Sequence, residues 1–164
     1  MKPPVACPAS ERARRFDARP NRAIQDSVMA LGTLALHQLE ARLPKVISPE
    51  VHGIIDYCHA AFFATMAAIW WKRNRRAAFA AATTSAFVLT ESLLTDYKWG
   101  VADVIPFSVH GQIDGAFSAA SLGVPKTFGF EGTGAASVFQ ANAFVEAVVV
   151  GLTDWNSERA RAAK

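Results

Sequence analysis

Two short motifs recur along this chain at one fixed spacing. Residues 51–56 read VHGIID, and residues 109–114 read VHGQID, 58 positions later. The same offset carries the LTD of residues 94–96 onto the LTD of residues 152–154. Two motifs that keep one offset indicate an internal repeat, in which each copy begins with a His-x3-Asp pair and ends at Thr-Asp. The sequence therefore predicts two tandem copies of a two-helix unit, over residues 48–105 and 106–158.

The basic residues are distributed as in a membrane protein. Three long stretches, 77–97, 99–125 and 127–158, contain no Lys or Arg. A helix in water needs a polar face, whereas Lys or Arg at the centre of a bilayer costs ~2.5 to 3.5 kcal/mol on insertion scales. The pattern favours lipid as the solvent of these segments. The alternative is an alanine-rich soluble bundle.

Four apolar segments, at about 49–71, 77–95, 106–125 and 135–153, are each close to the ~20 residues that cross a bilayer. Short gaps between them predict antiparallel neighbours. We therefore expect an all-α fold, a four-helix transmembrane bundle built from two tandem helical hairpins within residues 46–158. The expected location is the bacterial inner membrane, with several crossings. The orientation stays open, because the basic residues nearly balance between the two faces.

The ends of the chain differ from this apolar part. Residues 1–20 are rich in Pro and charge and predict a disordered tail. Residues 21–45 predict an amphipathic helix lying at the membrane interface, and residues 159–164 a basic tail. The expected partners are membrane lipids, whose anionic headgroups suit these basic residues. Nucleic acid is not expected, since aromatic residues are not interleaved with the basic ones.

The repeated pairs, His52 with Asp56 and His110 with Asp114, are the main candidate site. Residues four apart share one face of a helix, and the repeat places both pairs at equal depth. Three interpretations remain open from sequence. The pairs cap and organise the helices without a cofactor, which is the leading hypothesis; they form a metal or proton site; or the two histidines ligate a haem.

Other acidic residues fall within or at the ends of the predicted helices. Asp96 and Asp154 close the second and fourth helices, and Glu91 lies about one turn before Asp96. Glu146 lies about seven residues before the end of the fourth helix, hence ~10 Å into the bilayer. A carboxyl group at that depth needs a bonded partner. His59 is one candidate, or else a packed imidazole.

The motifs of common enzymes are missing from the sequence. It contains no nucleophile elbow, no phosphate-binding glycine loop and no HExxH. We therefore expect a non-enzymatic membrane protein whose His/Asp pairs organise the bundle. The alternative is a transporter or sensor of a small solute, a proton or a metal ion, in a homo-oligomer, that uses the two pairs and Glu146.

The second half carries a further pattern, IPFSVH at 105–110, Asp114, AAS at 119–121 and FGF at 128–130. It resembles the bacterial SPW-repeat integral membrane proteins over about residues 48–155. The resemblance implies a small multispanning protein of two-helix repeats without an assigned activity. This chain departs from the family where Val124-Pro125-Lys126 stands in place of Ser-Pro-Trp.

Overall fold

The computed structural model describes residues 43–162 and 164, so the predicted tail at 1–20 and almost all of the predicted helix at 21–45 lie outside the described residues. The protein is mostly helical, in agreement with the predicted class. The elements in chain order are α2 (Pro49–Trp70), α3 (Arg75–Leu94), β1 (Thr95–Asp96), β2 (Ile105–Pro106), α4 (Phe107–Ser121), α5 (Val124–Phe128), α6 (Gly134–Leu152) and α7 (Ser157–Ala162).

Polar side chains mark where the three long helices begin. The Ser48 side chain accepts a hydrogen bond from the Val51 amide, and Pro49 occupies the first turn of α2. Asn74 caps α3 and Thr133 caps α6 in the same way. These oxygens satisfy amides that have no partner within the helix. The helix start predicted at Ser48-Pro49 is confirmed.

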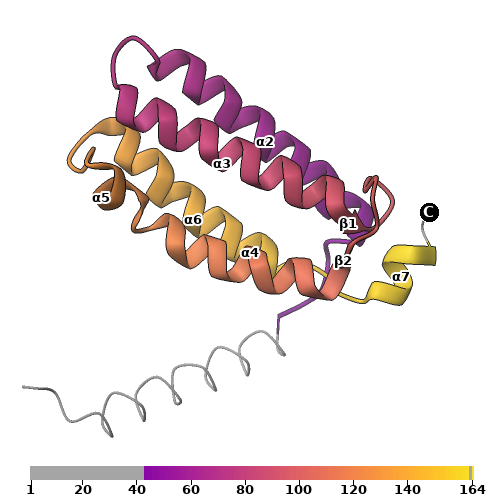
Figure 1. Ribbon diagram of the computed structural model, residues 1–164. Coiled ribbons are helices and arrows are strands. Elements are labelled where there is room, and N and C mark those ends of the chain that lie inside the picture. Colours follow the sequence, from indigo (N-terminus) through magenta and orange to yellow (C-terminus); the bar gives the residue numbers. More distant parts are fainter. Residues whose placement is uncertain (1–42, 163) are drawn as a thin grey trace, which may run out of the picture. The chain divides into compact units, whose positions relative to one another are not determined.

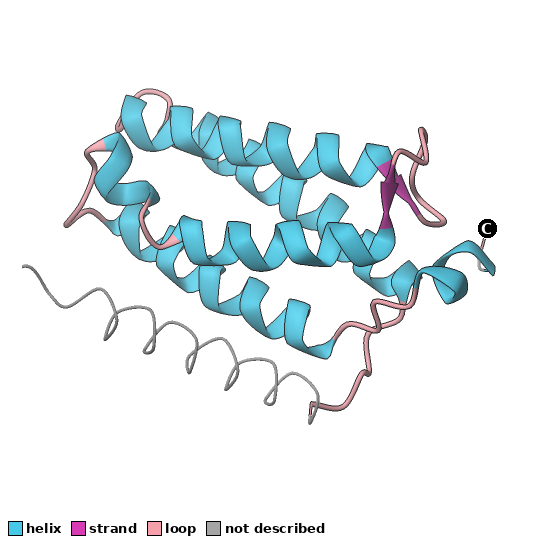
Figure 2. Ribbon diagram, turned by 60° about the horizontal axis from the view of Figure 1, so that its bottom comes forward, coloured by secondary structure: helices cyan, strands magenta, loops and turns pink. Residues whose placement is uncertain are grey.

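The long helices form two hairpins (Figures 1 and 2). α2 packs along α3, and α4 packs along α6. Small residues let the backbones approach closely, as is common between membrane helices. In the first hairpin the Ser85 hydroxyl donates to the Ala60 carbonyl at 2.7 Å, and in the second the Ser118 hydroxyl donates to the Ala143 carbonyl at 2.8 Å. A 58-residue offset relates both pairs.

The third apolar segment differs from its prediction as one long helix. α4 ends at Ser121 after 15 residues, and α5 begins separately at Val124. Pro125 explains the break, because proline has no amide hydrogen and its ring clashes with the carbonyl four residues earlier. Among the described residues, three helices, α2, α3 and α6, are long and apolar enough to cross a membrane.

The hairpins are tied together at the end where β1 and β2 lie (Figure 1). β1 pairs in parallel with β2, with Thr95 opposite Ile105. A parallel bridge joins Ile47 to Thr153, 58 residues before and after these partners. The segment that opens each hairpin therefore lies beside the segment that closes the other one.

The short helix α7 covers most of the segment that was predicted to be a basic tail. Asp96 holds it in place. The Nε atom of Arg161 lies 2.6 Å from Oδ2 of Asp96, and Nζ of Lys164 lies 3.0 Å from Oδ1. Lys164 also pairs with Asp103. The hydrogen bond from Arg161, and next that from Lys164, hold the pKa of Asp96 below its usual range.

This link predicts that the docking of α7 weakens in acid. A carboxyl group whose pKa is depressed on folding stabilises the fold above its unfolded pKa, ~3.9 for Asp, and loses that contribution as pH falls through the folded pKa. We expect the backbone amide NMR signals of α7 to shift toward random-coil positions below about pH 4. In Asp96→Asn they should do so already at pH 7. The effect should be modest because the pairs are solvent-exposed. Identical α7 spectra of the two proteins at pH 7 would contradict this role.

Candidate metal centre

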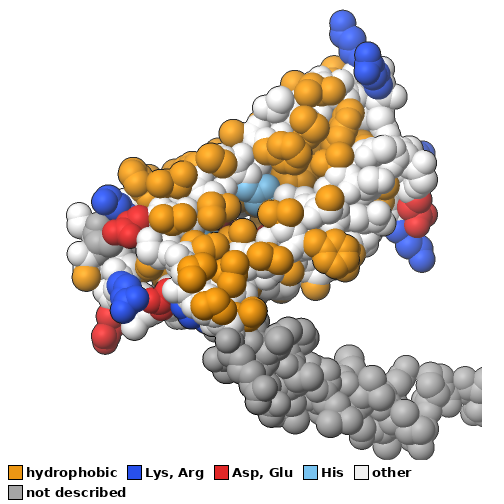
Figure 3. Space-filling model, turned by 180° about the vertical axis from the view of Figure 1, so that it is seen from behind, with side chains coloured by type: hydrophobic (Ala, Val, Ile, Leu, Met, Phe, Trp, Pro, Cys, Tyr) orange, Lys and Arg blue, Asp and Glu red, His pale blue; other side chains and the backbone are white. Residues whose placement is uncertain are grey.

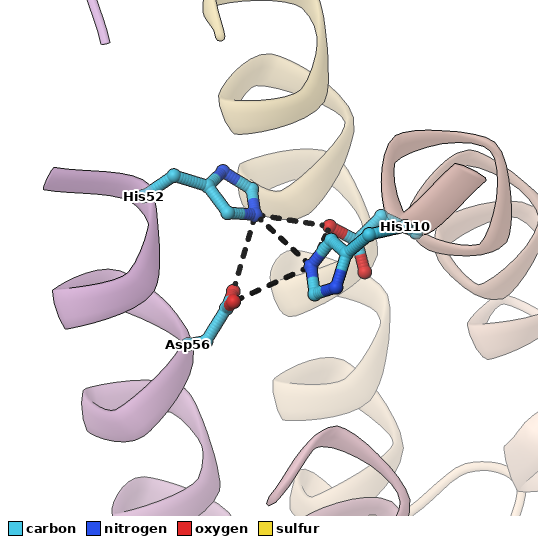
Figure 4. A group of neighbouring side chains, drawn as sticks. His52, Asp56 and His110 are labelled. Carbon is cyan, nitrogen blue, oxygen red and sulfur yellow. Dashed lines mark hydrogen bonds and ion pairs between the residues drawn. The ribbon is translucent and has the colours of Figure 1, made fainter. Parts of the chain in front are cut away.

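Two helix faces bring four polar side chains together near the β1–β2 end of the bundle. His52 and Asp56 lie one turn apart on α2, and His110 and Asp114 lie one turn apart on α4. All four side chains point toward one another between the hairpins (Figure 4). The two histidines are each only 1% exposed, and the two aspartates are also buried. We call these four residues the His/Asp cluster.

The ring nitrogens and carboxylate oxygens of the cluster are in direct contact. Nε2 of His52 lies 3.3 Å from Nε2 of His110, 3.1 Å from Oδ2 of Asp114 and 3.3 Å from Oδ1 of Asp56. Nε2 of His110 lies 3.1 Å from Oδ2 of Asp114 and 3.3 Å from Oδ2 of Asp56. One potential ligand atom from each residue falls within 4.8 Å of all the others.

Two threonines orient the imidazole rings from behind. Nδ1 of His110 lies 2.7 Å from Oγ1 of Thr95, and Nδ1 of His52 lies 3.0 Å from Oγ1 of Thr153. Each threonine hydroxyl also lies close to the carbonyl four residues earlier in its helix, at 2.8 Å for Thr95 and 2.6 Å for Thr153. A carbonyl only accepts, so each hydroxyl hydrogen goes there, and each Nδ1 must donate to the threonine oxygen.

This hydrogen bonding assigns the tautomer of both neutral histidines. With the hydrogen on Nδ1, each Nε2 carries a lone pair directed at the centre of the cluster. Two lone pairs and two carboxylates then face one another at 3.1–3.3 Å. Such an arrangement is repulsive unless positive charge lies between them. Either protons on both Nε2 atoms or one divalent cation would balance the two carboxylates.

Aromatic rings close the cluster toward the β1–β2 end of the molecule. The Trp155 ring packs edge-on against His52, with 4.6 Å between centroids, and Phe107 packs 5.7 Å from His52. Tyr97 and Phe107 are completely buried. Glu91 lies behind His110, with Oε1 3.7 Å from Nδ1, and this oxygen has no hydrogen-bond partner among the described residues. The cluster is therefore dry on this side and held rigidly.

Comparison of the chain with family models, with curated proteins and with solved structures finds no match. The resemblance to the SPW-repeat family therefore stays a prediction. What the cluster does has to be argued from its own geometry.

The other residues singled out by sequence lie apart from the cluster. Asp96 and Asp154 pair with Arg161 and Arg159 at the surface. Glu146 is buried on α6 and accepts a hydrogen bond from Asn142 at 3.3 Å. His59 does not contact Glu146 by a hydrogen bond in the described structure, although both line one cavity.

The geometry also decides between two cofactors considered from sequence. The Nε2 atoms of His52 and His110 are 3.3 Å apart, which leaves no space for a porphyrin ring between the imidazoles. The haem interpretation is therefore wrong for this pair. The roles of Thr95 and Thr153 were missed, although their 58-residue offset matched that of the histidines they contact.

Proposed function

We propose that this protein is a small, non-enzymatic integral membrane protein that holds one divalent transition-metal ion, Zn²⁺ or one of similar preference, between its two hairpins. One observation carries the proposal. The threonines direct both imidazole lone pairs, together with two carboxylates, at a single buried point. The metal ion would organise the bundle, which is the role expected for the His/Asp pairs from sequence.

The distribution of polar and apolar side chains supports a membrane location. Large apolar side chains point outward from the helices, whereas the inward positions carry Ser, Thr, His, Asp and Glu. Lys and Arg gather at the two ends of the molecule, with hydrophobic side chains between them (Figure 3). This is the reverse of a water-soluble protein, in which large outward apolar surfaces are rare. Lipid around four helices accounts for it, with α4 and α5 together filling the fourth position.

The ligand set and its spacing favour a tetrahedral ion. Bonds of ~2.0 to 2.2 Å to nitrogen or oxygen place neighbouring ligands of a tetrahedral zinc roughly 3.3 to 3.5 Å apart. The separations in the His/Asp cluster, 3.1–3.3 Å, are close to this range. Imidazole with carboxylate suits zinc better than calcium or magnesium, which prefer oxygen alone. Four protein ligands make a closed site, so the proposed role is structural rather than transport.

A second candidate is a cluster without metal, in which both imidazoles are protonated. Each Nε2–H would then donate to a carboxylate, and the net charge would again be zero. The short histidine–carboxylate distances are compatible with this state. Metal analysis separates the two candidates.

We also propose that the two hairpins are copies of one ancestral unit, as in the SPW-repeat family that the sequence resembles. Support comes from contacts at the 58-residue offset. They include His52 with Thr153 and His110 with Thr95.

The main test is metal binding by the purified full-length chain in detergent. We expect about one Zn²⁺ per chain by elemental analysis, and Co²⁺ should give the intense visible absorption of a tetrahedral site. Asp114→Asn should lose this binding. Asp154→Asn, an acid at the same end that pairs only with Arg159, is the matched control and should retain it. Wild type that stays metal-free in excess Zn²⁺ would refute the metal proposal and leave the protonated cluster.

Zinc binding is also predicted to release protons. A ligand nitrogen must be unprotonated to bind a metal ion. Zn²⁺ therefore replaces up to two protons, and its affinity should rise with pH. A pH indicator in weakly buffered detergent measures the release. Tight zinc binding that releases no protons and does not vary between pH 5 and pH 8 would show that the ion binds elsewhere.

The membrane location is tested by fractionation. After cell lysis and ultracentrifugation, the protein should pellet with membranes, resist extraction by alkaline carbonate and dissolve in mild detergent. A folded, monodisperse species in the detergent-free supernatant would refute the location.

A further inference from the structure

A cavity of about 260 Å³ lies beside the His/Asp cluster, between α2 and α6. Its walls are mostly apolar, and its largest apolar contributors are Ile55, Phe62, Val88, Val145, Val149 and Val150. His52, Asp56 and Asp114 close one end of it. The cavity is open on one side, on the part of α2 and α6 whose neighbouring side chains, such as Val148, point outward. A histidine side chain is visible among hydrophobic ones on one face of the molecule (Figure 3).

Two polar groups in this cavity lack the partners that buried groups normally have. Nε2 of His59 is buried and has no hydrogen-bond partner among the described residues. Glu146 is 8% exposed, and its described hydrogen bond is the one at 3.3 Å from Asn142. Buried polar atoms are nearly always hydrogen-bonded, so each exception calls for a missing partner.

His59 and Glu146 lie at similar depth in the bundle. His59 follows His52 by seven residues on α2, and Glu146 precedes Thr153 by seven residues along α6. Each step corresponds to ~10 Å along a helix. The cavity therefore has two polar ends, the His/Asp cluster at one and the His59–Glu146 pair at the other, separated by apolar walls.

The size and the lining restrict what fits. A cavity of ~150 Å³ with apolar walls holds benzene, so this one has room for a substituted single ring. A lipid acyl chain would match the walls but leave His59 and Glu146 unpaired. A water molecule needs two to four polar partners, which the apolar middle of the cavity does not provide. A ring with one hydroxyl group satisfies both the walls and the polar end.

We propose that this cavity binds an uncharged, membrane-dissolved ring compound of the phenol or hydroquinone class, whose hydroxyl group is hydrogen-bonded by His59 and Glu146. The inference rests on the proposed membrane location and does not require the metal ion. The ligand would enter from the bilayer through the open side of the cavity, with its ring against the valines of α6.

The test uses radiolabelled 4-ethylphenol and the full-length protein in lipid nanodiscs, with empty nanodiscs measuring partition into lipid. We expect saturable binding at one site per chain, and ethylbenzene, which lacks the hydroxyl, should compete at least roughly threefold more weakly. Val149→Phe fills the cavity and should abolish binding. Val148→Phe, the same change one residue away at a position 58% exposed, should not.

Substitution of the polar end tests the hydrogen bonds. Glu146→Leu and His59→Phe should each weaken 4-ethylphenol binding roughly three- to tenfold, and ethylbenzene should then compete equally well. Zinc content and circular dichroism of the same samples show whether each variant is folded. Non-saturable binding in wild type, equal competition by ethylbenzene, or full binding by Val149→Phe would overturn the proposal. Zinc binding without phenol binding would overturn this inference alone, and the reverse would overturn the metal proposal alone.

Discussion

Replacing His110 with alanine is expected to abolish zinc binding and to destabilise the fold by ~3 to 5 kcal/mol, the usual range when one partner of a buried charged group is removed. The change leaves Asp56 and Asp114 buried without the nitrogen that both contact at 3.1–3.3 Å. It also leaves the Thr95 oxygen without its donor. Thermal unfolding in detergent, with and without Zn²⁺, measures both effects.

The zinc dependence separates metal loss from simple damage to the fold. A bound ion raises the midpoint of wild-type unfolding by an amount that grows with its concentration. His110→Ala should show no such increase, and neither should the milder His110→Gln. His59→Ala, also a histidine of the bundle but outside the cluster, should keep the full zinc response. A normal zinc response in His110→Ala would mean that the cluster is not the metal site.

The second large effect is expected at Gly111, where the Trp155 ring packs directly on the backbone of α4. A Cβ atom added at Gly111 would lie 2.5 to 2.7 Å from three carbons of the indole. The ring is fixed between His52 and Phe107, so it has little room to move. Overpacking of this kind typically costs ~1 to 3 kcal/mol. Gly111→Ala should therefore lower the unfolding midpoint and weaken zinc binding, because Trp155 also supports the His52 ring.

Gly115 provides the matched control one turn further along the same helix. A Cβ atom there meets only Val150, at 4.0 Å. Since alanine favours a helix by roughly 0.5 to 1 kcal/mol over glycine, Gly115→Ala should be neutral or stabilising. Equal midpoints for the two variants would show that the indole contact does not restrict Gly111.

The repeated His-x3-Asp spacing was sufficient to place four residues of the centre on two helix faces, because helical geometry alone sets which residues share a face. The two threonines could not be assigned by the same rule. Thr95 and Thr153 lie where α3 and α6 end, and their contacts with the histidines depend on how the closing segment of one hairpin lies beside the other. Only the shared 58-residue offset in the sequence pointed to them.

The limits of the third helix were predictable in part. Pro125 was visible in the sequence, and its consequence for the carbonyl of Ser121 follows from proline geometry. Apolar composition alone nevertheless predicted one uninterrupted helix through residue 125. The folding of residues 157–162 into α7 was not predicted, because it depends on pairs such as Asp96 with Arg161, 65 positions apart in the chain.

The exchange of partners between the hairpins has a consequence for biosynthesis. His52 leaves the ribosome about 100 residues before Thr153, the side chain that fixes its tautomer. During translation the first hairpin therefore inserts with an unfinished centre, which only the last turn of α6 completes. A nascent chain arrested before that turn should not retain zinc, so metal acquisition would report that synthesis has finished.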